Sequence, residues 1–378
     1  ETGGKYFYVG GRSLSFLPLA HAYGCAFDFL AQLVVGGHIT LLGRMPSPKI
    51  LVDAMQNVKP TVICSVPLIL EKVYRKMIMP MLEKGPMSIA MKIPFVNAAL
   101  YTIIKSKLMA SFGGEAQIFI VGGAPMNQET ESFLRKINFP LTIGYGMTEC
   151  APLISYEHPR YFKSGSCGRY LPGLMEAKIM SNDPQNIPGE ILVRGENVMM
   201  GYYNNPEATA EAIDADGWFH TGDIGTMVED KFLKITDRKK EIFKTSGGKY
   251  IVPQVMENDF KQSRFIEQIM VIGESEKFPG AFIVPMYNFI RDWSERKGLN
   301  LAKLSNEELA QHPAVIARIQ VEVDALNKKY GSWEQIKRFK LLANEFTVET
   351  GELTPTLKFK RKIILSKYQD AYKEIFSV

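Results

Sequence analysis

The segment QIFIVGGAPMNQETESFLRKINFPLTIGYGMTE (residues 117–149) decides the fold of the chain. It contains two short apolar runs, Gln117–Val121 and Leu141–Ile143, each followed directly by a glycine-containing loop. Between them, Asn127 can cap a helix that ends near Ile137. This order predicts a right-handed βαβ unit, which brings both glycine loops to the carboxyl edge of one sheet. Open α/β sheets bind ligands at that edge, so the geometry favours a site here.

Similar short apolar runs alternate with longer amphipathic stretches upstream of this segment. They are Ser13–Leu19, Ile39–Leu42 and Thr61–Val66. The runs are rich in Ile, Val, Leu and Phe and show little polar alternation, which is typical of parallel strands covered on both faces by helices. We therefore predict an α/β fold with a parallel sheet over residues 1–160.

The pattern changes after Gly165 to short strands separated by Pro-Gly and Asp-Gly turns. It predicts a β-rich subdomain over residues 161–239, which completes the large N-terminal part of the chain, residues 1–239. From residue 240 to 378 a mixed α/β pattern returns, with helical segments and many lysines. We expect this second part to be a small separate α/β domain.

The composition describes a folded globular protein, with 46% hydrophobic and 22% charged residues. The net charge of +5 fits an anionic substrate or weak contact with anionic lipid. No basic stripe interleaved with aromatics is present, so we expect no nucleic-acid partner. The 4 cysteines lack metal-ligand spacing, and no signal peptide or long apolar span is recognisable. Reduced thiols in a cytoplasmic protein are expected.

Several short motifs occur in a fixed order along the chain. They are Phe16–Gly24 (FLPLAHAYG), Gly122–Pro125 (GGAP), Tyr145–Glu149 (YGMTE), Asp216–Asp223 (DGWFHTGD), Asp237–Lys240 (DRKK) and Gly351–Lys358 (GELTPTLK). Together they resemble the acyl-adenylate-forming (AMP-binding) superfamily, most closely the long-chain fatty acyl-CoA synthetases. The resemblance implies that residues 1–239 are the C-terminal portion of a large adenylation domain and that residues 240–378 are a small mobile domain.

The resemblance also implies a two-step reaction. A fatty acid carboxylate attacks the α-phosphorus of ATP, and the CoA thiol then displaces AMP from the acyl-AMP. Charge develops on phosphate oxygens in the first step, so cations, backbone N–H groups and Mg²⁺ should supply most of the catalysis. The implied catalytic residues are Lys358, Thr148 and Glu149, with Thr148 at the α-phosphate and Glu149 as the Mg²⁺ ligand. An ordinary acid in a surface loop is the alternative for Glu149.

The implied nucleotide site combines an acid for the ribose hydroxyls, Asp223, with donors from Arg238. Small residues let adenine approach the backbone on one face, and Tyr145 stacks on the other. The alternatives are an ordinary acid in a hairpin for Asp223, a tight turn for the pair of glycines at 122 and 123, and a core aromatic for Tyr145. The full set implied to bind nucleotide is Gly122, Gly123, Ala124, Pro125, Gly144, Tyr145, Gly146, Thr148, Asp223, Arg238 and Lys249.

Other residues take their implied roles from the same resemblance. His21 and Gly144 would line the acyl pocket, although a histidine at a strand end is commonly structural. Lys358 would neutralise carboxylate and phosphate oxygens, whereas the alternative is a solvated basic tail. Lys240 matches the hinge of the small domain, and Lys249 offers phosphate a point charge without the fork of arginine. We expect His220 to pack and not to react.

The chain departs from the family pattern upstream. Nothing before Ser13 matches the family's lysine-bearing loop for the β- and γ-phosphates. We expect the chain to be part of a longer enzyme, because a sheet without its neighbouring strands leaves apolar edges open; a natural truncation is the alternative. A truncated chain could also be a non-catalytic nucleotide-binding protein.

The acyl group is predicted from two features. The position of the amine-binding aspartate in amino-acid-activating relatives falls on Tyr23, with Asp28 out of register, so a fatty acid is favoured over an amino acid. Residues 77–112 form an apolar insertion with several lysines, which could meet the inner face of a membrane or simply cover the core. A ligase for a medium-chain or aryl carboxylate would keep every motif except the acyl pocket.

Overall fold

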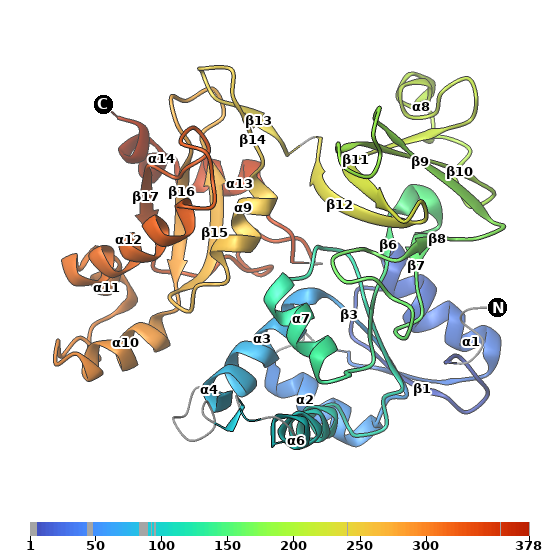
Figure 1. Cartoon of the computed structure of the whole chain (residues 1–378), viewed down its shortest axis with the longest axis horizontal. Helices are drawn as coiled ribbons and strands as arrows, with labels where there is room; N and C mark the ends of the chain where they lie inside the picture. Colours follow the sequence, from blue (N-terminus) through green and yellow to red (C-terminus); the bar gives the residue numbers. More distant parts are fainter. Residues whose placement is uncertain are drawn as a thin grey trace. The chain divides into compact units, whose positions relative to one another are not determined.

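The computed structural model describes residues 6–43, 48–82, 90–91, 93, 96–239, 241–355 and 357–377. The chain forms two compact units, Glu1–Thr236 and Asp237–Val378, coloured from blue to yellow and from yellow to red in Figure 1. Within the described part of the chain, no helix is both long and apolar enough to cross a membrane.

The first unit contains a five-stranded parallel sheet in the order β2-β1-β3-β4-β5. Its strands are β1 (Arg12–Ser15), β2 (His38–Leu41), β3 (Val62–Ser65), β4 (Ile118–Val121) and β5 (Leu141–Ile143). Every residue of β3, β4 and β5 is buried, as expected for strands that helices cover on both faces. The predicted α/β fold with a parallel sheet is confirmed.

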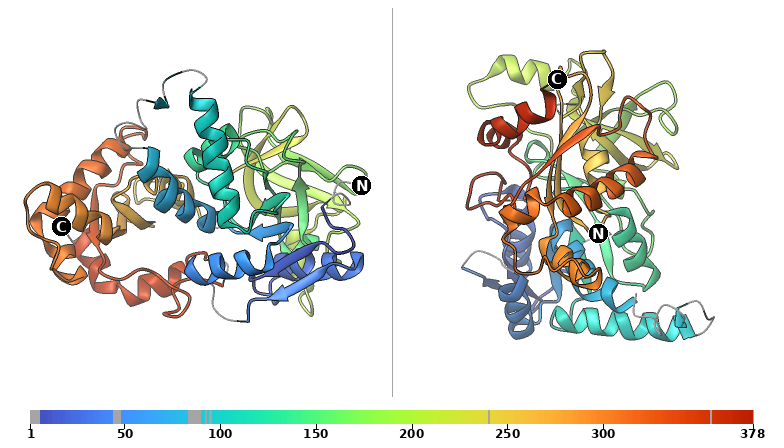
Figure 2. Two further views of the ribbon diagram at one scale, coloured as in Figure 1. Left: turned by 90° about the horizontal axis from the view of Figure 1, so that it is seen from below. Right: turned by 90° about the vertical axis from the view of Figure 1, so that its left-hand side faces the viewer.

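Helices connect these strands. They are η1 (Gly24–Leu30, a π-helix), α1 (Ala31–Val35), α2 (Pro48–Val58), α3 (Pro67–Val73), η2 (Tyr74–Ile78, a π-helix), α4 (Met79–Leu82), α6 (Val96–Ser111) and α7 (Gln128–Lys136). The chain steps one way from β1 to β2 and the other way through β3, β4 and β5. Right-handed crossovers therefore place η1 and α1 on one face and the later helices on the other. On that second face α2 packs against α6 (Figures 1 and 2).

The βαβ unit has the predicted form. Asn127 caps α7, because its Oδ1 accepts a hydrogen bond from the Thr130 N–H at 3.0 Å. Leu134 faces the core with 1% of its surface exposed. Strands β4 and β5 pair in parallel, with Val121 opposite Ile143. Both glycine loops therefore leave the sheet at the same edge.

A second sheet of seven strands follows, in the order β6-β7-β8-β12-β11-β10-β9. Its strands are β6 (Tyr145–Gly146), β7 (Leu153–Tyr156), β8 (Arg169–Tyr170), β9 (Met175–Met180), β10 (Gly189–Gly195), β11 (Phe219–Val228) and β12 (Phe232–Arg238); α8 spans Pro206–Ala212. The sheet begins at Tyr145, inside the motif that follows β5, so it starts earlier than the expected boundary at residue 161. The reason is that Tyr145 and Ser155 pair across a short antiparallel ribbon.

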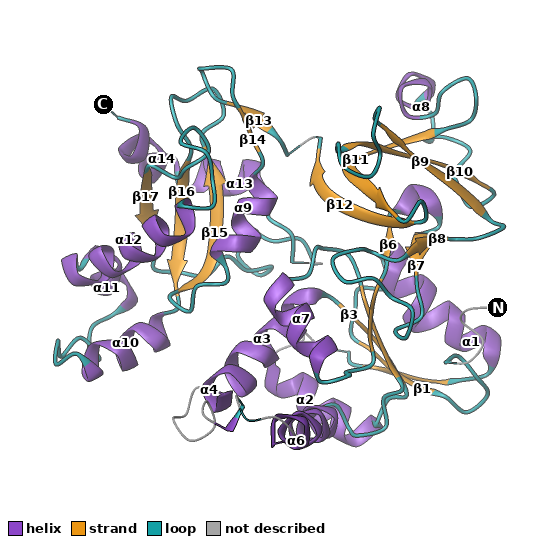
Figure 3. Cartoon of the chain, viewed as in Figure 1, coloured by secondary structure: helices purple, strands orange, loops and turns teal. Residues whose placement is uncertain are grey.

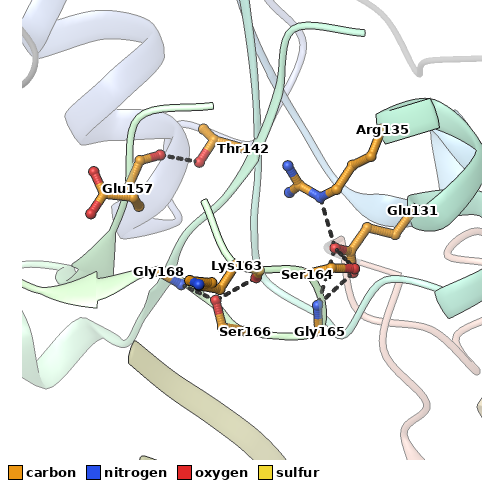
Figure 4. Close-up of polar contacts among 9 residues, drawn as sticks. All are labelled: Glu131, Arg135, Thr142, Glu157, Lys163, Ser164, Gly165, Ser166 and Gly168. Atoms are coloured by element: carbon orange, nitrogen blue, oxygen red, sulfur yellow. Dashed lines mark hydrogen bonds and ion pairs between the residues drawn. The ribbon is translucent and has the colours of Figure 1, made fainter. Parts of the chain in front are cut away.

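One carboxylate joins the two sheets (Figure 4). Glu131 on α7 has 3% of its surface exposed, and its Oε1 accepts hydrogen bonds from Arg135 Nε at 2.9 Å, Ser164 Oγ at 3.0 Å and the Gly165 N–H at 3.1 Å. The guanidinium carbon of Arg135 lies 3.9 Å from the ring centroid of Phe162. The loop between β7 and β8 is thus held against a helix of the first sheet.

The second unit is built around a three-stranded sheet, β15-β16-β17, with β16 antiparallel to β15 and parallel to β17 (Figure 3). The strands of this sheet are β15 (Ile266–Ile272), β16 (Gly280–Pro285) and β17 (Arg338–Leu341). A separate two-stranded sheet consists of β13 (Phe243–Lys244) and β14 (Tyr250–Ile251). The helices of this unit are α9 (Pro253–Phe260), α10 (Tyr287–Arg296), α11 (Asn306–Gln311), α12 (Pro313–Asn327), α13 (Arg361–Lys367) and α14 (Gln369–Phe376). All six residues of β16 are buried, so this unit has its own apolar core.

Candidate functional site

Three loops reach the carboxyl edge of the parallel sheet. The segment with His21 follows β1, Gly122–Pro125 follows β4, and Gly144 follows β5. The last two loops are adjacent, since a Cβ placed on Gly122 would lie 3.4 Å from the carbonyl oxygen of Gly144. His21 Nδ1 accepts a hydrogen bond from the Tyr23 N–H at 3.3 Å. These contacts gather the residues predicted for adenine and for the acyl group at one edge.

The side chain of Tyr23 packs against the start of the loop that follows β4. Its hydroxyl donates to the carbonyl of Ile120 at 2.8 Å, and its ring lies 3.6 Å from a Cβ placed on Gly122. Asp28 is buried, with 1% of its surface exposed, and burial raises the pKa of its carboxyl to about 7. At this position, therefore, an aromatic ring and not a carboxylate lies beside Gly122.

The structure joins two predicted site residues that are far apart in sequence. The Tyr145 hydroxyl donates to Asp223 Oδ2 at 2.7 Å, and both side chains are buried. Burial, followed by the charge of Asp223, raises the pKa of Tyr145 well above its usual range, so the phenol stays a donor. The Asp223 N–H bonds to Thr221 Oγ1 at 3.1 Å. Tyr145 also belongs to the apolar core of this region, as the alternative interpretation expected.

Thr148 and Glu149 lie in a single 3₁₀ turn, η3 (Thr148–Cys150), that follows β6. The chain returns very close to itself here, because a Cβ on Gly146 would lie 2.0 Å from the carbonyl oxygen of Pro152. Thr148 is exposed and Glu149 half-buried, so both can be reached from solvent. Tyr202 Oη donates to Glu149 Oε1 at 3.0 Å.

A magnesium ion fits this turn only as a partner of substrate. No cluster of three or more His, Cys, Asp or Glu side chains that could hold a metal occurs among the residues that the structure describes. Mg²⁺ commonly binds through one or two carboxylates together with waters and substrate phosphates. One accessible carboxylate beside an accessible hydroxyl suits that mode of binding.

The remaining predicted residues belong to the second unit. Lys358 lies in a loop closed by two hydrogen bonds, from the Thr354 N–H to the Lys358 carbonyl at 2.8 Å and from the Lys358 N–H to Thr354 Oγ1 at 3.0 Å. Lys249 lies in the turn before β14, with Nζ 5.4 Å from the ring centroid of Trp333. Arg238 ends β12, and Lys240 lies outside the described residues.

Sequence reasoning missed the partners of these side chains. Tyr202 is the clearest case, because it contacts Glu149 from a position with no spacing relationship to the YGMTE motif. Glu190 is another: its Oε1 accepts from the Gly222 N–H at 3.2 Å, and its Oε2 lies 3.4 Å from His220 Nδ1. His220 is thus in contact with a neighbouring acid in the hairpin.

Comparison with known proteins adds independent information. Residues 3–203 match the AMP-binding enzyme family, and residues 240–378 match the AMP-binding enzyme C-terminal domain. The chain is 33% identical to Long-chain-fatty-acid--CoA ligase FadD15 of Mycobacterium tuberculosis, over 97% of this chain and 62% of that protein. It is 31% identical to Long-chain-fatty-acid--CoA ligase 1 of Homo sapiens, over 96% of this chain and 54% of that protein. The chain therefore spans less than two thirds of either relative.

Solved structures share the fold. The A domain of carboxylic acid reductase from Segniliparus rugosus, in complex with AMP and a co-purified carboxylic acid, superposes with a TM-score of 0.75 at 24% identity, over 96% of this chain and 54% of that chain. O-succinylbenzoate Coenzyme A Synthetase from Bacillus subtilis, in complex with AMP, superposes with a TM-score of 0.64 at 21% identity, over 93% and 60%. From the match to the family and from this shared fold, we conclude that the chain belongs to the AMP-binding enzyme family.

Proposed function

We propose that this chain carries out the ATP-dependent activation of a fatty acid to acyl-AMP and then to acyl-CoA. The observation that supports this best is the joining of Tyr145, Asp223 and the Thr148–Glu149 turn to the carboxyl edge of the sheet in a member of this family. The relatives compared above are named long-chain-fatty-acid–CoA ligases, which favours a long acyl chain.

The nucleotide would bind across the junction of the two sheets. Asp223 would use its two carboxylate oxygens for the two ribose hydroxyls, and the Tyr145 hydroxyl, which donates to Oδ2, would hold that carboxylate in place. Adenine would lie along Gly122, Gly123, Ala124 and Pro125, with Gly144, Tyr145 and Gly146 on its other side. Arg238 would add donors at the ribose.

The chemistry follows from charge. A fatty acid carboxylate is already ionised and needs no general base to attack the α-phosphorus. Thr148 would donate its hydroxyl to the α-phosphate, and Glu149 would hold Mg²⁺. When bound, Mg²⁺ neutralises the negative charge that develops on the phosphate oxygens.

The second unit would supply a different lysine in each of the two steps of the reaction. Lys358 would neutralise the carboxylate and α-phosphate oxygens during adenylation, and Lys249 would meet phosphate during thioester formation. Lys240 would act as the hinge between these steps, because hinges are short segments that absorb a backbone change.

The acyl chain would enter beside His21 and Gly144. The phenol ring of Tyr23 beside Gly122 supports a fatty acid over an amino acid, because this position offers no carboxylate to an ammonium group. Helix α6 covers the core through Ile104 and Leu108, but exposes Ile103 by 50%, one helical turn before the exposed Lys107. We propose that this outer face, part of residues 77–112, contacts an anionic membrane surface that holds the fatty acid.

Pyrophosphate release tests the function. The protein is incubated with MgATP and saturated fatty acids of increasing length, alongside benzoate as an aryl carboxylate. We expect release that increases toward the long chains. A maximum with medium chains or benzoate would support the alternative ligase, and AMP binding by calorimetry without any pyrophosphate release would indicate a non-catalytic nucleotide-binding protein.

Replacing Glu149 with alanine should lower the rate of acyl-AMP formation by about 100-fold or more, the scale of losing one transition-state charge contact. AMP binding in the absence of metal should change little, because Asp223 and the glycine loops are untouched. Glu211→Ala, which removes an exposed acid of α8, serves as the control. Undiminished turnover in Glu149→Ala would refute the metal role.

A further inference from the structure

Residues between β10 and α8 donate hydrogen bonds to the turn that carries Glu149. Asn197 Nδ2 donates to the carbonyl oxygens of Cys150 and Leu153, both at 2.8 Å. The Met199 N–H donates to the carbonyl oxygen of Glu149 at 2.7 Å. The backbone at Glu149 and directly after it is therefore held by a segment about fifty residues away in sequence.

The same segment also reaches the carboxylate itself. Tyr202 Oη donates to Glu149 Oε1 at 3.0 Å, and the described residues make no hydrogen bond to Oε2. Burial comes first and the hydrogen bond to Glu149 second in raising the pKa of Tyr202, so the phenol keeps its proton. One carboxylate oxygen is thus held and the other is left available.

Tyr202 is itself held in place. Its N–H donates to Thr209 Oγ1 at 2.9 Å, and the Thr209 hydroxyl donates to the carbonyl of Asn205 at 2.9 Å. Gly201 has φ +153°, and a Cβ there would lie 2.8 Å from Thr209 Cγ2, so only glycine allows this approach to α8. The main chain from which the phenol extends is therefore held against α8.

We propose that Tyr202 is a positioning residue for Glu149, holding Oε1 so that Oε2 is the oxygen offered to the divalent cation that accompanies ATP. This inference rests on the proposed function. Mg²⁺ demands near-octahedral geometry, so a carboxylate that swings freely binds it less well than one already oriented. Hydrogen-bond partners behind a metal ligand typically contribute about 10- to 100-fold in metal affinity.

The test compares two adjacent tyrosines. Tyr202→Phe removes only the hydroxyl that contacts Glu149, and Tyr203→Phe removes a hydroxyl from a side chain that is 93% exposed. Mn²⁺ replaces Mg²⁺ as an EPR probe, and α,β-methylene-ATP replaces ATP so that no turnover occurs. We expect Mn²⁺ affinity in the nucleotide complex to fall about 10-fold in Tyr202→Phe and to stay at the wild-type value in Tyr203→Phe. Metal-free AMP affinity should be the same in all three proteins.

A double-mutant cycle makes the test specific. In a Glu149→Gln background, Tyr202→Phe should cause no further loss of Mn²⁺ affinity, because the two residues act through the same contact. Equal Mn²⁺ affinity in the Tyr202→Phe and Tyr203→Phe proteins would overturn the proposal, and so would a loss that persists undiminished in the Glu149→Gln background. If Glu149→Gln alone leaves Mn²⁺ affinity unchanged, the proposed metal role of Glu149 fails first, which is a distinct result.

Discussion

Replacing Lys358 with alanine should slow acyl-AMP formation by about 100- to 1,000-fold, the usual cost of losing one preorganised group at a charged transition state. The loop should keep its shape, since the bonds between Lys358 and Thr354 described above involve the backbone of Lys358. Formation of acyl-CoA from supplied acyl-AMP should fall much less, because that step needs no neutralisation of the attacking carboxylate.

Two single-turnover assays measure this difference. One follows acyl-AMP formed from labelled ATP and fatty acid, and the other follows acyl-CoA formed from acyl-AMP and CoA. Lys362→Ala is the matched control, because Lys362 is an exposed lysine of the same basic segment. Equal losses in both assays would argue against a role in adenylation, and equal losses in Lys358→Ala and Lys362→Ala would indicate a general basic tail.

The second large effect is on stability. Arg361, at the start of α13, donates through Nη2 to both oxygens of Glu257, at 2.8 and 2.9 Å, and through Nη1 to the carbonyl of Val271 at 3.1 Å. Only 5% of the Glu257 side chain is exposed. Arg361→Met leaves that buried carboxylate without its main countercharge, which should cost about 3–5 kcal/mol of the unfolding free energy of the second unit.

The cost should depend on pH in a defined direction. Burial raises the pKa of Glu257 even with Arg361 opposing it, and removing Arg361 raises that pKa further. A carboxyl whose pKa is higher in the folded state binds more protons when folded, so stability falls as pH rises. The destabilisation by Arg361→Met should thus be smallest below the raised pKa that Glu257 has in the folded wild-type protein, and should grow as the pH rises above that value.

Urea unfolding followed by tryptophan fluorescence measures this loss, because Trp293 and Trp333 lie in the second unit. Lys340→Met breaks the exposed ion pair with Glu374 and should cost less than about 1 kcal/mol. Arg361→Met combined with Glu257→Met should recover much of the lost stability, since no buried charge is then left without its partner. A small, pH-independent effect of Arg361→Met would contradict the prediction.

The parallel sheet could be predicted from sequence because its signal is local. Runs such as Gln117–Val121 are apolar throughout, and Asn127 precedes the helix that it caps. The start of the second sheet could not be predicted, since β6 has only two residues and one of them is glycine. Two residues are too few to show the alternation that identifies a strand.

The candidate site residues also divide into those that a local motif marks and those that only a distant contact reveals. The motif YGMTE marks Tyr145 and Glu149 by their neighbours, but their partners lie 78 and 53 residues away, at Asp223 and Tyr202. No periodicity links such positions, because the contacts form only after the chain has folded back through β10 and β11. Asp223 can be identified from the resemblance to a family, whereas the role of Tyr202 becomes visible only in the folded structure.

The carboxylate of Glu131 has a consequence for chain entropy. Its bond to the Gly165 N–H closes a loop of 34 residues that contains β5, β6 and the turn with Thr148 and Glu149. The entropy of closing a loop changes slowly with its length, by about 0.6 kcal/mol for each doubling. Insertions in the exposed stretches of this loop, outside β5, β6 and the turn with Thr148 and Glu149, should therefore be tolerated far better than loss of Glu131, which would release the β7–β8 connection from the first sheet.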